Sequence, residues 1–163
     1  MRDLERSVCG CDYGSTSWTT RREAGRIAHL LELRPAEKLL DVGAESGWPG
    51  LYLAHLTGCD VVLVDLPLAA LRTALECASA DSLSQRCEVV AADGAALPFE
   101  DASFDALIHS DVLCCTPDKL AVLPGVSPRR ARGRQYGVHG YRAHTLIGRL
   151  RASDRDRVRP AVC

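Results

Sequence analysis

Apolar positions recur at helical spacing near the start of the chain. Between residues 21 and 34 one face of such a helix would carry Ala24, Ile27, Leu30 and Leu31. Thr20 and Glu23 form a capping-box pattern, which predicts that the helix begins at Thr20. Pro35 is expected to end it, because proline cannot continue the helical hydrogen-bond pattern.

Short apolar runs then alternate with helical stretches. The predicted strands cover residues 38–42, 60–65, 87–93 and 104–110. Helices are expected at residues 47–57 and 67–80, and Pro49 is tolerated in the first turn of the former because no amide hydrogen bond is lost there. This alternation predicts an open, doubly wound parallel α/β sheet with both faces covered.

The pattern fails after Leu123. Residues 124–163 hold ten arginines, no lysine and no sustained period, and only residues 143–150 could form a turn or two of helix. Residues 1–123 carry ten Lys or Arg against nineteen Asp or Glu, whereas residues 124–163 carry ten Arg against two Asp. We therefore expect an N-terminal segment at 1–19, a folded core at 20–123 and an irregular Arg-rich tail at 124–163.

Composition narrows the class of protein. A chain of 163 residues with 47% apolar and 25% charged residues is typical of one soluble globular domain. No apolar run approaches the roughly 18 residues of a membrane helix, and the charged N-terminus does not fit a signal peptide, so a cytoplasmic location is expected. The eight cysteines show no paired CxxC spacing, which favours reduced thiols over a metal site.

Three acids end three consecutive predicted strands, and the first is followed by a glycine-bearing turn. Ligands of open α/β sheets bind beyond the carboxyl ends of the strands. Asp41 lies beside Gly43 and Gly47, which would let the backbone turn tightly and approach a ligand. Asp65 could accept both hydroxyls of a ribose, and Asp93 could accept from an adenine amino group. Any one acid alone is better explained as a cap or turn former, but the three together fit a nucleoside that carries positive charge.

These residues resemble a known family. From about Tyr13 to Asp118 the chain is similar to class I S-adenosylmethionine-dependent methyltransferases of the small-molecule type. "LLDVGAESGWPG" resembles the family's first motif, an acid, one residue and then Gly-x-Gly-x-Gly, with Glu45 at the middle glycine. "VVLVDLP" matches the acid of the second strand, and "AADGAALPFEDASFDALIHSDVLCC" is similar to the stretch around the third and fourth strands.

The resemblance implies S-adenosylmethionine as cofactor, a small-molecule methyl acceptor and a set of site residues. The implied cofactor-binding residues are Asp41, Gly43, Gly47, Asp65, Leu66, Asp93, Gly94 and Ser110, with Tyr13 and Trp18 as candidates for a closing lid. His109, beside the sulfonium, is the best-placed general base; alternatively it only closes the cofactor pocket.

The resemblance also implies more strands than the four predicted here, so the fourth strand is expected to be left as an open edge. We hypothesise that the chain is truncated or frameshifted after about residue 123, and the alternative function is an inactive fragment that at most binds cofactor or a partner. The Arg-rich tail, with Tyr136 and Tyr141, could bind nucleic acid non-specifically, but specific recognition is not expected. Oligomeric state is left open.

Overall fold

The structure, a computed structural model, describes residues 2–8, 12–14, 17–100, 103–110 and 145–148. From α2 to β3 its helices and strands alternate, as the apolar pattern predicted. They are α1 (Arg2–Val8), α2 (Arg21–Leu31), β1 (Lys38–Val42), α3 (Gly50–Thr57), β2 (Asp60–Asp65), α4 (Leu68–Ala80), β3 (Cys87–Ala91), β4 (Ala106–Ser110) and β5 (Thr145–Gly148).

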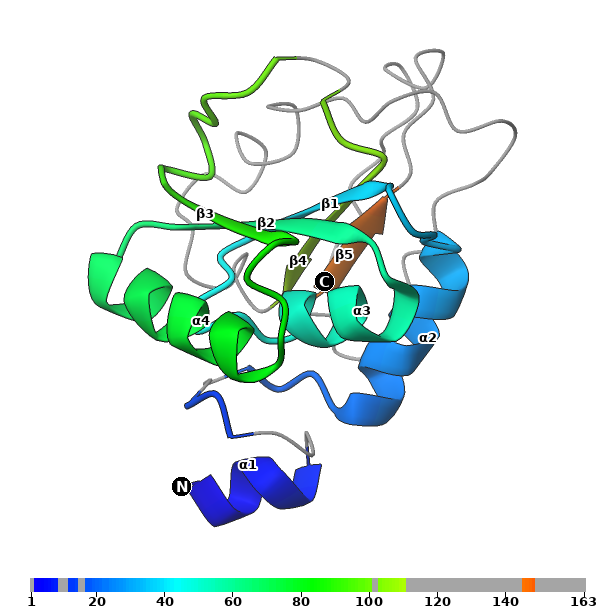
Figure 1. Ribbon diagram of the computed structural model, residues 1–163, viewed down its shortest axis with the longest axis vertical. Coiled ribbons are helices and arrows are strands. Elements are labelled where there is room, and N and C mark those ends of the chain that lie inside the picture. The colour runs from blue at the N-terminus through cyan, green and yellow to red at the C-terminus, as the bar shows by residue number, and fades with distance from the viewer. Residues whose placement is uncertain (1, 9–11, 15–16, 101–102, 111–144, 149–163) are drawn as a thin grey trace, which may run out of the picture.

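One sheet organises the described chain, in the strand order β3-β2-β1-β4-β5 (Figure 1). The first four strands of that order are parallel, and β5 runs antiparallel to β4. Strand order reverses at β1, which pairs with β2 on one side and with β4 on the other. The predicted open α/β fold with a parallel sheet is therefore confirmed, and its switch point lies between β1 and β4.

The outer edge of β4 is occupied, contrary to the expected open edge. Pairing with β5 runs from Leu107 opposite Gly148 to Ser110 opposite Thr145. This pairing satisfies backbone groups that β4 would otherwise leave exposed. The expectation of helix within residues 143–150 was also wrong, since 145–148 form a strand. Residues 111–144 and 149–163 lie outside the described residues, so the irregular tail and the truncation stay predictions.

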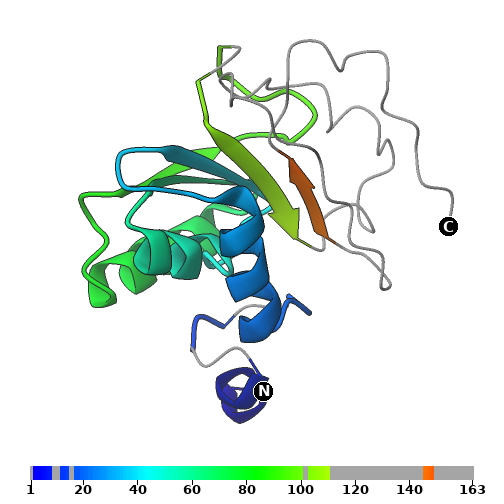
Figure 2. The ribbon, with the colours of Figure 1, turned by 90° about the vertical axis from the view of Figure 1, so that its right-hand side faces the viewer.

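Helices α2, α3 and α4 all pack on one face of the sheet, here called the helix face (Figures 1 and 2). Strand residues that point into this layer include Leu39, Leu63 and Ile108. The residues between them in the chain point to the far face, where Leu40 and Leu107 pack with Val62, Val64 and Phe104. This alternation determines which side of the sheet each side chain near the strand ends can reach.

Capping residues and backbone conformation explain where α2 begins and ends. Thr20 caps α2 with the predicted capping box, accepting from the Glu23 amide while the Glu23 carboxylate accepts from the Thr20 amide. The helix ends before Pro35 because Glu32 adopts a left-handed conformation, with φ 47°. Helix α3 starts at Gly50, with Pro49 as its N-cap residue, three residues later than expected.

Cys59, Cys77 and Cys87, the cysteines in the described chain, are free thiols, and burial raises the pKa of the Cys87 thiol to about 11.

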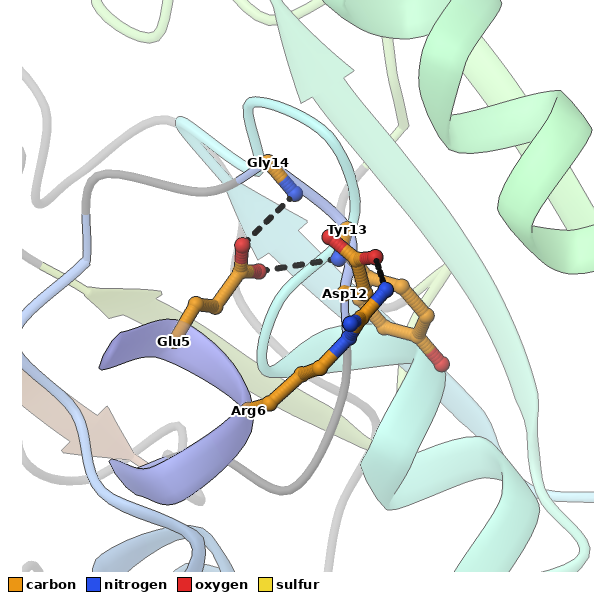
Figure 3. A network of polar contacts seen from close by, with 5 residues as sticks. All are labelled: Glu5, Arg6, Asp12, Tyr13 and Gly14. Carbon is orange, nitrogen blue, oxygen red and sulfur yellow. Dashed lines mark hydrogen bonds and ion pairs between the residues drawn. The ribbon is translucent and has the colours of Figure 1, made fainter. Parts of the chain in front are cut away.

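Figure 3 shows a network of polar contacts within the N-terminal segment, and a hydrogen bond from Tyr13 connects this segment to the rest of the domain. The Glu5 carboxylate accepts from the amides of Tyr13 (2.9 Å) and Gly14 (3.0 Å), and Arg6 pairs with Asp12. The Tyr13 hydroxyl donates to the Asp81 carboxylate just beyond α4. These contacts join α1 to residues 12–14 and join Tyr13 to Asp81.

We expect Tyr13→Phe to lower the free energy of unfolding by about 1 kcal/mol, because it removes the hydrogen bond to Asp81. Tyr52→Phe is the matched control, since the Tyr52 hydroxyl has a long 3.5 Å contact with Arg21 Nε. Urea unfolding of the three proteins measures the effect. Equal losses in the two variants would contradict a specific role for the Tyr13 hydroxyl.

Candidate functional site

The segment between β1 and α3 is a tight turn that lies against β2. Gly43 N–H and Ala44 N–H both donate to the Val64 carbonyl, at 2.7 and 3.1 Å. Gly43 and Gly47 have φ values of 73° and 103°, a region that favours glycine. A Cβ at Gly47 would lie 2.5 Å from Leu51 Cδ1, so this turn admits no side chain there.

Asp41 lies at the carboxyl end of β1 and is fully buried. Its Oδ2 accepts from Gly50 N–H at 3.0 Å, so the carboxyl group caps the first turn of α3. A Cβ on Gly50 would lie 2.5 Å from that oxygen, which explains the glycine. Burial raises the pKa of Asp41 well above its usual value, the bond from Gly50 lowers it, and the charge of Asp65 raises it.

Three buried oxygens without a hydrogen-bond partner belong to the ends of β1 and β4 and to the turn that follows β1. They are Asp41 Oδ1, Ser46 Oγ and Ser110 Oγ. Asp41 pairs with Ile108, whose side chain points to the helix face, and Ser110 follows two residues later on the same face. Buried polar groups without partners cost about 1 to 3 kcal/mol each, so each calls for an explanation such as a functional role or a bound group that supplies the missing hydrogen bond. This set can hold a ligand that carries both hydrogen-bond donors and acceptors.

Asp65, at the end of β2, is held in one orientation by two backbone amides. Its Oδ2 accepts from Glu45 N–H and its Oδ1 from Leu66 N–H, each at 2.7 Å. Each carboxylate oxygen keeps a further lone pair, so the group can still accept from a pair of hydroxyls. Leu66 is 65% exposed next to it and offers an apolar surface.

Asp93 and Gly94 follow β3 in an exposed turn. Asp93 Oδ1 accepts from Ala95 N–H at 2.9 Å, and its carbonyl accepts from Ala96 N–H. This is the turn-forming role that a lone acid at a strand end would have. Both bonds are local to the turn, so they do not tie Asp93 to the acids after β1 and β2.

His109 points away from the group around Asp41. It lies between Ile108 and Ser110 in β4, so alternation directs its side chain to the far face. It is 1% exposed, neither ring nitrogen has a hydrogen-bond partner, and burial lowers its pKa to about 4. The imidazole is therefore neutral at pH 7. The resemblance implied that His109 and Ser110 lie side by side at one ligand atom, whereas the strand turns them to opposite faces.

The two lid candidates differ in their surroundings. Tyr13 stacks edge-on against Trp48, with ring centroids 6.3 Å apart, whereas Trp18 is 82% exposed. Trp48 is buried at the end of the glycine turn and donates from Nε1 to the Thr19 carbonyl at 2.7 Å. Trp48, Ser46 and Gly50 were not singled out from the sequence, although a tryptophan directly after a glycine turn is a signal for an anchored loop.

Neither a cluster of possible metal ligands nor a membrane-spanning helix is found in the described part of the chain. No group of three or more His, Cys, Asp or Glu among these residues could hold a metal ion. No helix that they form is long and apolar enough to cross a membrane.

Together the glycine turn, the fixed acid after β2 and the switch point between β1 and β4 define an α/β domain with a polar site at its strand ends. A profile described as a methyltransferase domain matches residues 40–126, more than half of the chain. This chain belongs to that methyltransferase family. Membership indicates S-adenosylmethionine as the cofactor, as the sequence resemblance implied.

Individual proteins agree with this assignment. The chain is 35% identical to 24-methylenesterol C-methyltransferase 2 of Oryza sativa subsp. japonica over 98 residues, which are 60% of this chain and 27% of the relative. The chain spans about a quarter of the length of the curated relatives it matches first.

Solved structures share the fold. The MccD protein superposes with a TM-score of 0.63 at 19% identity, over 68% of this chain and 48% of that one. An S-adenosylmethionine-dependent methyltransferase from Thiobacillus denitrificans, in complex with S-adenosylhomocysteine, gives 0.51 at 17% identity, over 66% of this chain and 42% of that one.

Two buried titratable groups, Asp41 and His109, predict opposite pH effects on stability in the acid range. Between pH 4 and the raised pKa of Asp41, the native state keeps a proton that the unfolded chain releases, so stability falls as pH rises. Between pH about 4 and 6.5 the unfolded chain binds a proton on His109 that the native state does not, so stability rises with pH.

We therefore expect Asp41→Asn, which keeps an acceptor for Gly50 N–H, to steepen the rise of Tm with pH between 4 and 6.5. His109→Asn should do the opposite and flatten it. Each unit of pKa difference contributes about 1.4 kcal/mol. Calorimetric melts at half-unit pH steps measure the slopes, and parallel curves for wild type and Asp41→Asn would contradict the raised pKa.

Proposed function

We propose that this chain binds S-adenosylmethionine at the carboxyl ends of β1, β2 and β4 and transfers its methyl group to a small molecule. The observation that carries the proposal is the group of buried, unpartnered oxygens of Asp41, Ser46 and Ser110 beside the glycine turn. Family membership supports the same conclusion.

The residues at the strand ends have chemical groups that suit the parts of the cofactor. Asp41 Oδ1 lacks a partner and would accept from the cofactor's ammonium group, which would also favour the ionised carboxylate. Asp65, held by two amides, would take the ribose hydroxyls, with Leu66 against the adenine. Asp93 and Gly94 would meet the adenine edge, and Gly43 and Gly47 would let the backbone approach.

When bound, S-adenosylmethionine supplies a methyl group on a positively charged sulfur, ready for displacement by an acceptor atom. The work of the chain is then to hold the acceptor in line and to exclude water, which contributes up to roughly 7 to 11 kcal/mol when the geometry is good. A general base is needed only where the acceptor loses a proton. His109 does not support that role, because its side chain points to the far face of the sheet and burial lowers its pKa to about 4.

A second candidate is a domain that binds the cofactor without transferring its methyl group. Glu45 favours it, because this residue adds a side chain where the family's first motif has a glycine, and its φ of 49° is uncommon for a non-glycine residue. Binding of a partner at an open β4 edge does not support this second candidate, since β5 occupies that edge. Transfer of a labelled methyl group to a panel of small acceptors separates the two candidates.

The test of cofactor binding compares two acids at opposite ends of β2. Asp65→Asn removes the charge at the proposed ribose site, whereas Asp60→Asn makes the same change at the start of the strand. We expect S-adenosylhomocysteine to raise the Tm of wild type and Asp60→Asn, and to bind Asp65→Asn at least about tenfold more weakly, the loss typical of a hydrogen bond to a charged group.

Near-UV circular dichroism follows the thermal transition with and without the ligand. Cooperative melting of all three proteins without any ligand-dependent shift would refute the proposed binding. Equal shifts in both variants would refute the role given to Asp65.

A further inference from the structure

Trp48 lies in the turn that leads into α3, two residues after Ser46 and two before Gly50. Both of these residues carry groups of the candidate site. The Ser46 hydroxyl is buried without a partner, and Gly50 N–H donates to Asp41 Oδ2. The Trp48 side chain is 2% exposed, so the side chains and backbone packed around it determine its position. Contacts that fix this ring therefore also fix the backbone between the two groups.

Two contacts of the Trp48 ring come from the segment before α2, of which residues 12–14 and 17–20 are described. The indole Nε1–H donates to the Thr19 carbonyl at 2.7 Å, a buried hydrogen bond between residues 29 apart in the chain. The Tyr13 ring packs edge-on against the indole, and Ala24 of α2 belongs to the same buried cluster. The glycine turn and the segment before α2 thus share one buried side chain.

This segment is anchored at α1 and at the end of α4. The Glu5 carboxylate of α1 accepts from the amides of Tyr13 and Gly14, and the Tyr13 hydroxyl donates to Asp81, the C-cap residue of α4. The contacts form a continuous path from α1 through Tyr13 and Trp48 to the glycine turn. Packed side chains and hydrogen bonds of this kind can carry energetic coupling between distant parts of a protein.

We propose that Trp48 is a positioning residue, through which the segment before α2 holds the glycine turn in the form that binds cofactor. This inference rests on the proposed function. Coupling of this kind is reciprocal. Loosening the segment weakens cofactor binding by the same factor by which bound cofactor stabilises the segment.

The first test measures Kd for S-adenosylhomocysteine by isothermal titration calorimetry. Trp48→Phe removes the Nε1–H donor and keeps an aromatic ring. We expect it to raise Kd about fivefold, the effect of losing the net contribution of one hydrogen bond. Phe104→Leu, a buried change on the far face of the sheet, is the control for a mere loss of packing and should leave Kd unchanged.

The second test loosens the segment without changing Trp48. Glu5→Ala removes the carboxylate that holds the segment to α1, and we expect it to raise Kd at least about twofold. Glu37→Ala is the matched control, since the Glu37 carboxylate accepts from Arg34 N–H at 2.9 Å, outside the segment, and its loss should leave Kd unchanged. In the Trp48→Phe background, Glu5→Ala should have little further effect, because the path is already interrupted.

Hydrogen exchange gives the reciprocal readout. Saturating S-adenosylhomocysteine should slow exchange of the Tyr13 and Gly14 amides in wild type, and should slow it less in Trp48→Phe. Equal protection of these amides in the two proteins would contradict the coupling.

An unchanged Kd in Glu5→Ala overturns the proposal, whether or not Trp48→Phe folds. The proposal is also overturned if Phe104→Leu weakens binding as much as Trp48→Phe does, because the effect would then be one of general stability. If every protein melts cooperatively and none binds S-adenosylhomocysteine, the proposed function itself fails.

Discussion

The hydrogen bond from Gly50 N–H to Asp41 Oδ2 joins the end of β1 to the beginning of α3, and the candidate site depends on it. The Asp41 side chain is completely buried, and its second oxygen, Oδ1, has no hydrogen-bond partner. Burial keeps this carboxyl group protonated to a higher pH than usual. The same side chain therefore caps α3 with one oxygen and offers the other to a ligand. Gly50 is part of the same constraint, since a methyl group there would collide with the carboxyl oxygen.

Hydrogen bonds connect the glycine turn after β1 to the end of β2. Gly43 and Ala44 bond to the Val64 carbonyl, and Glu45 bonds to the Asp65 side chain, so the acid after β2 is oriented by the turn after β1. Trp48 closes the turn through Thr19, which connects it to the segment before α2. Asp65 is thus oriented by backbone contacts between neighbouring segments of the chain.

Apolar runs predicted the parallel strands well where they were bounded by charged residues, as at Lys38–Val42 and Asp60–Asp65. The Thr20 capping box was equally local and was confirmed. β5 was missed because a four-residue strand has no recognisable period, and its pairing with β4 depends on contacts between distant parts of the chain. The turning of His109 away from Ser110 follows from alternation, but the direction of alternation depends on which face the helices cover. Sequence spacing alone does not contain that information.

The antiparallel strand beside β4 also affects the order of folding. β5 joins the sheet from residues 145–148, more than thirty residues beyond the end of β4 at Ser110. Bringing together strands so far apart in the sequence has an entropic cost that local helices do not have, and such distant pairings form late. During synthesis the outer edge of β4 therefore remains without its partner strand until residue 148 has been added. In that interval the nascent sheet has the exposed strand edge through which partly folded chains associate.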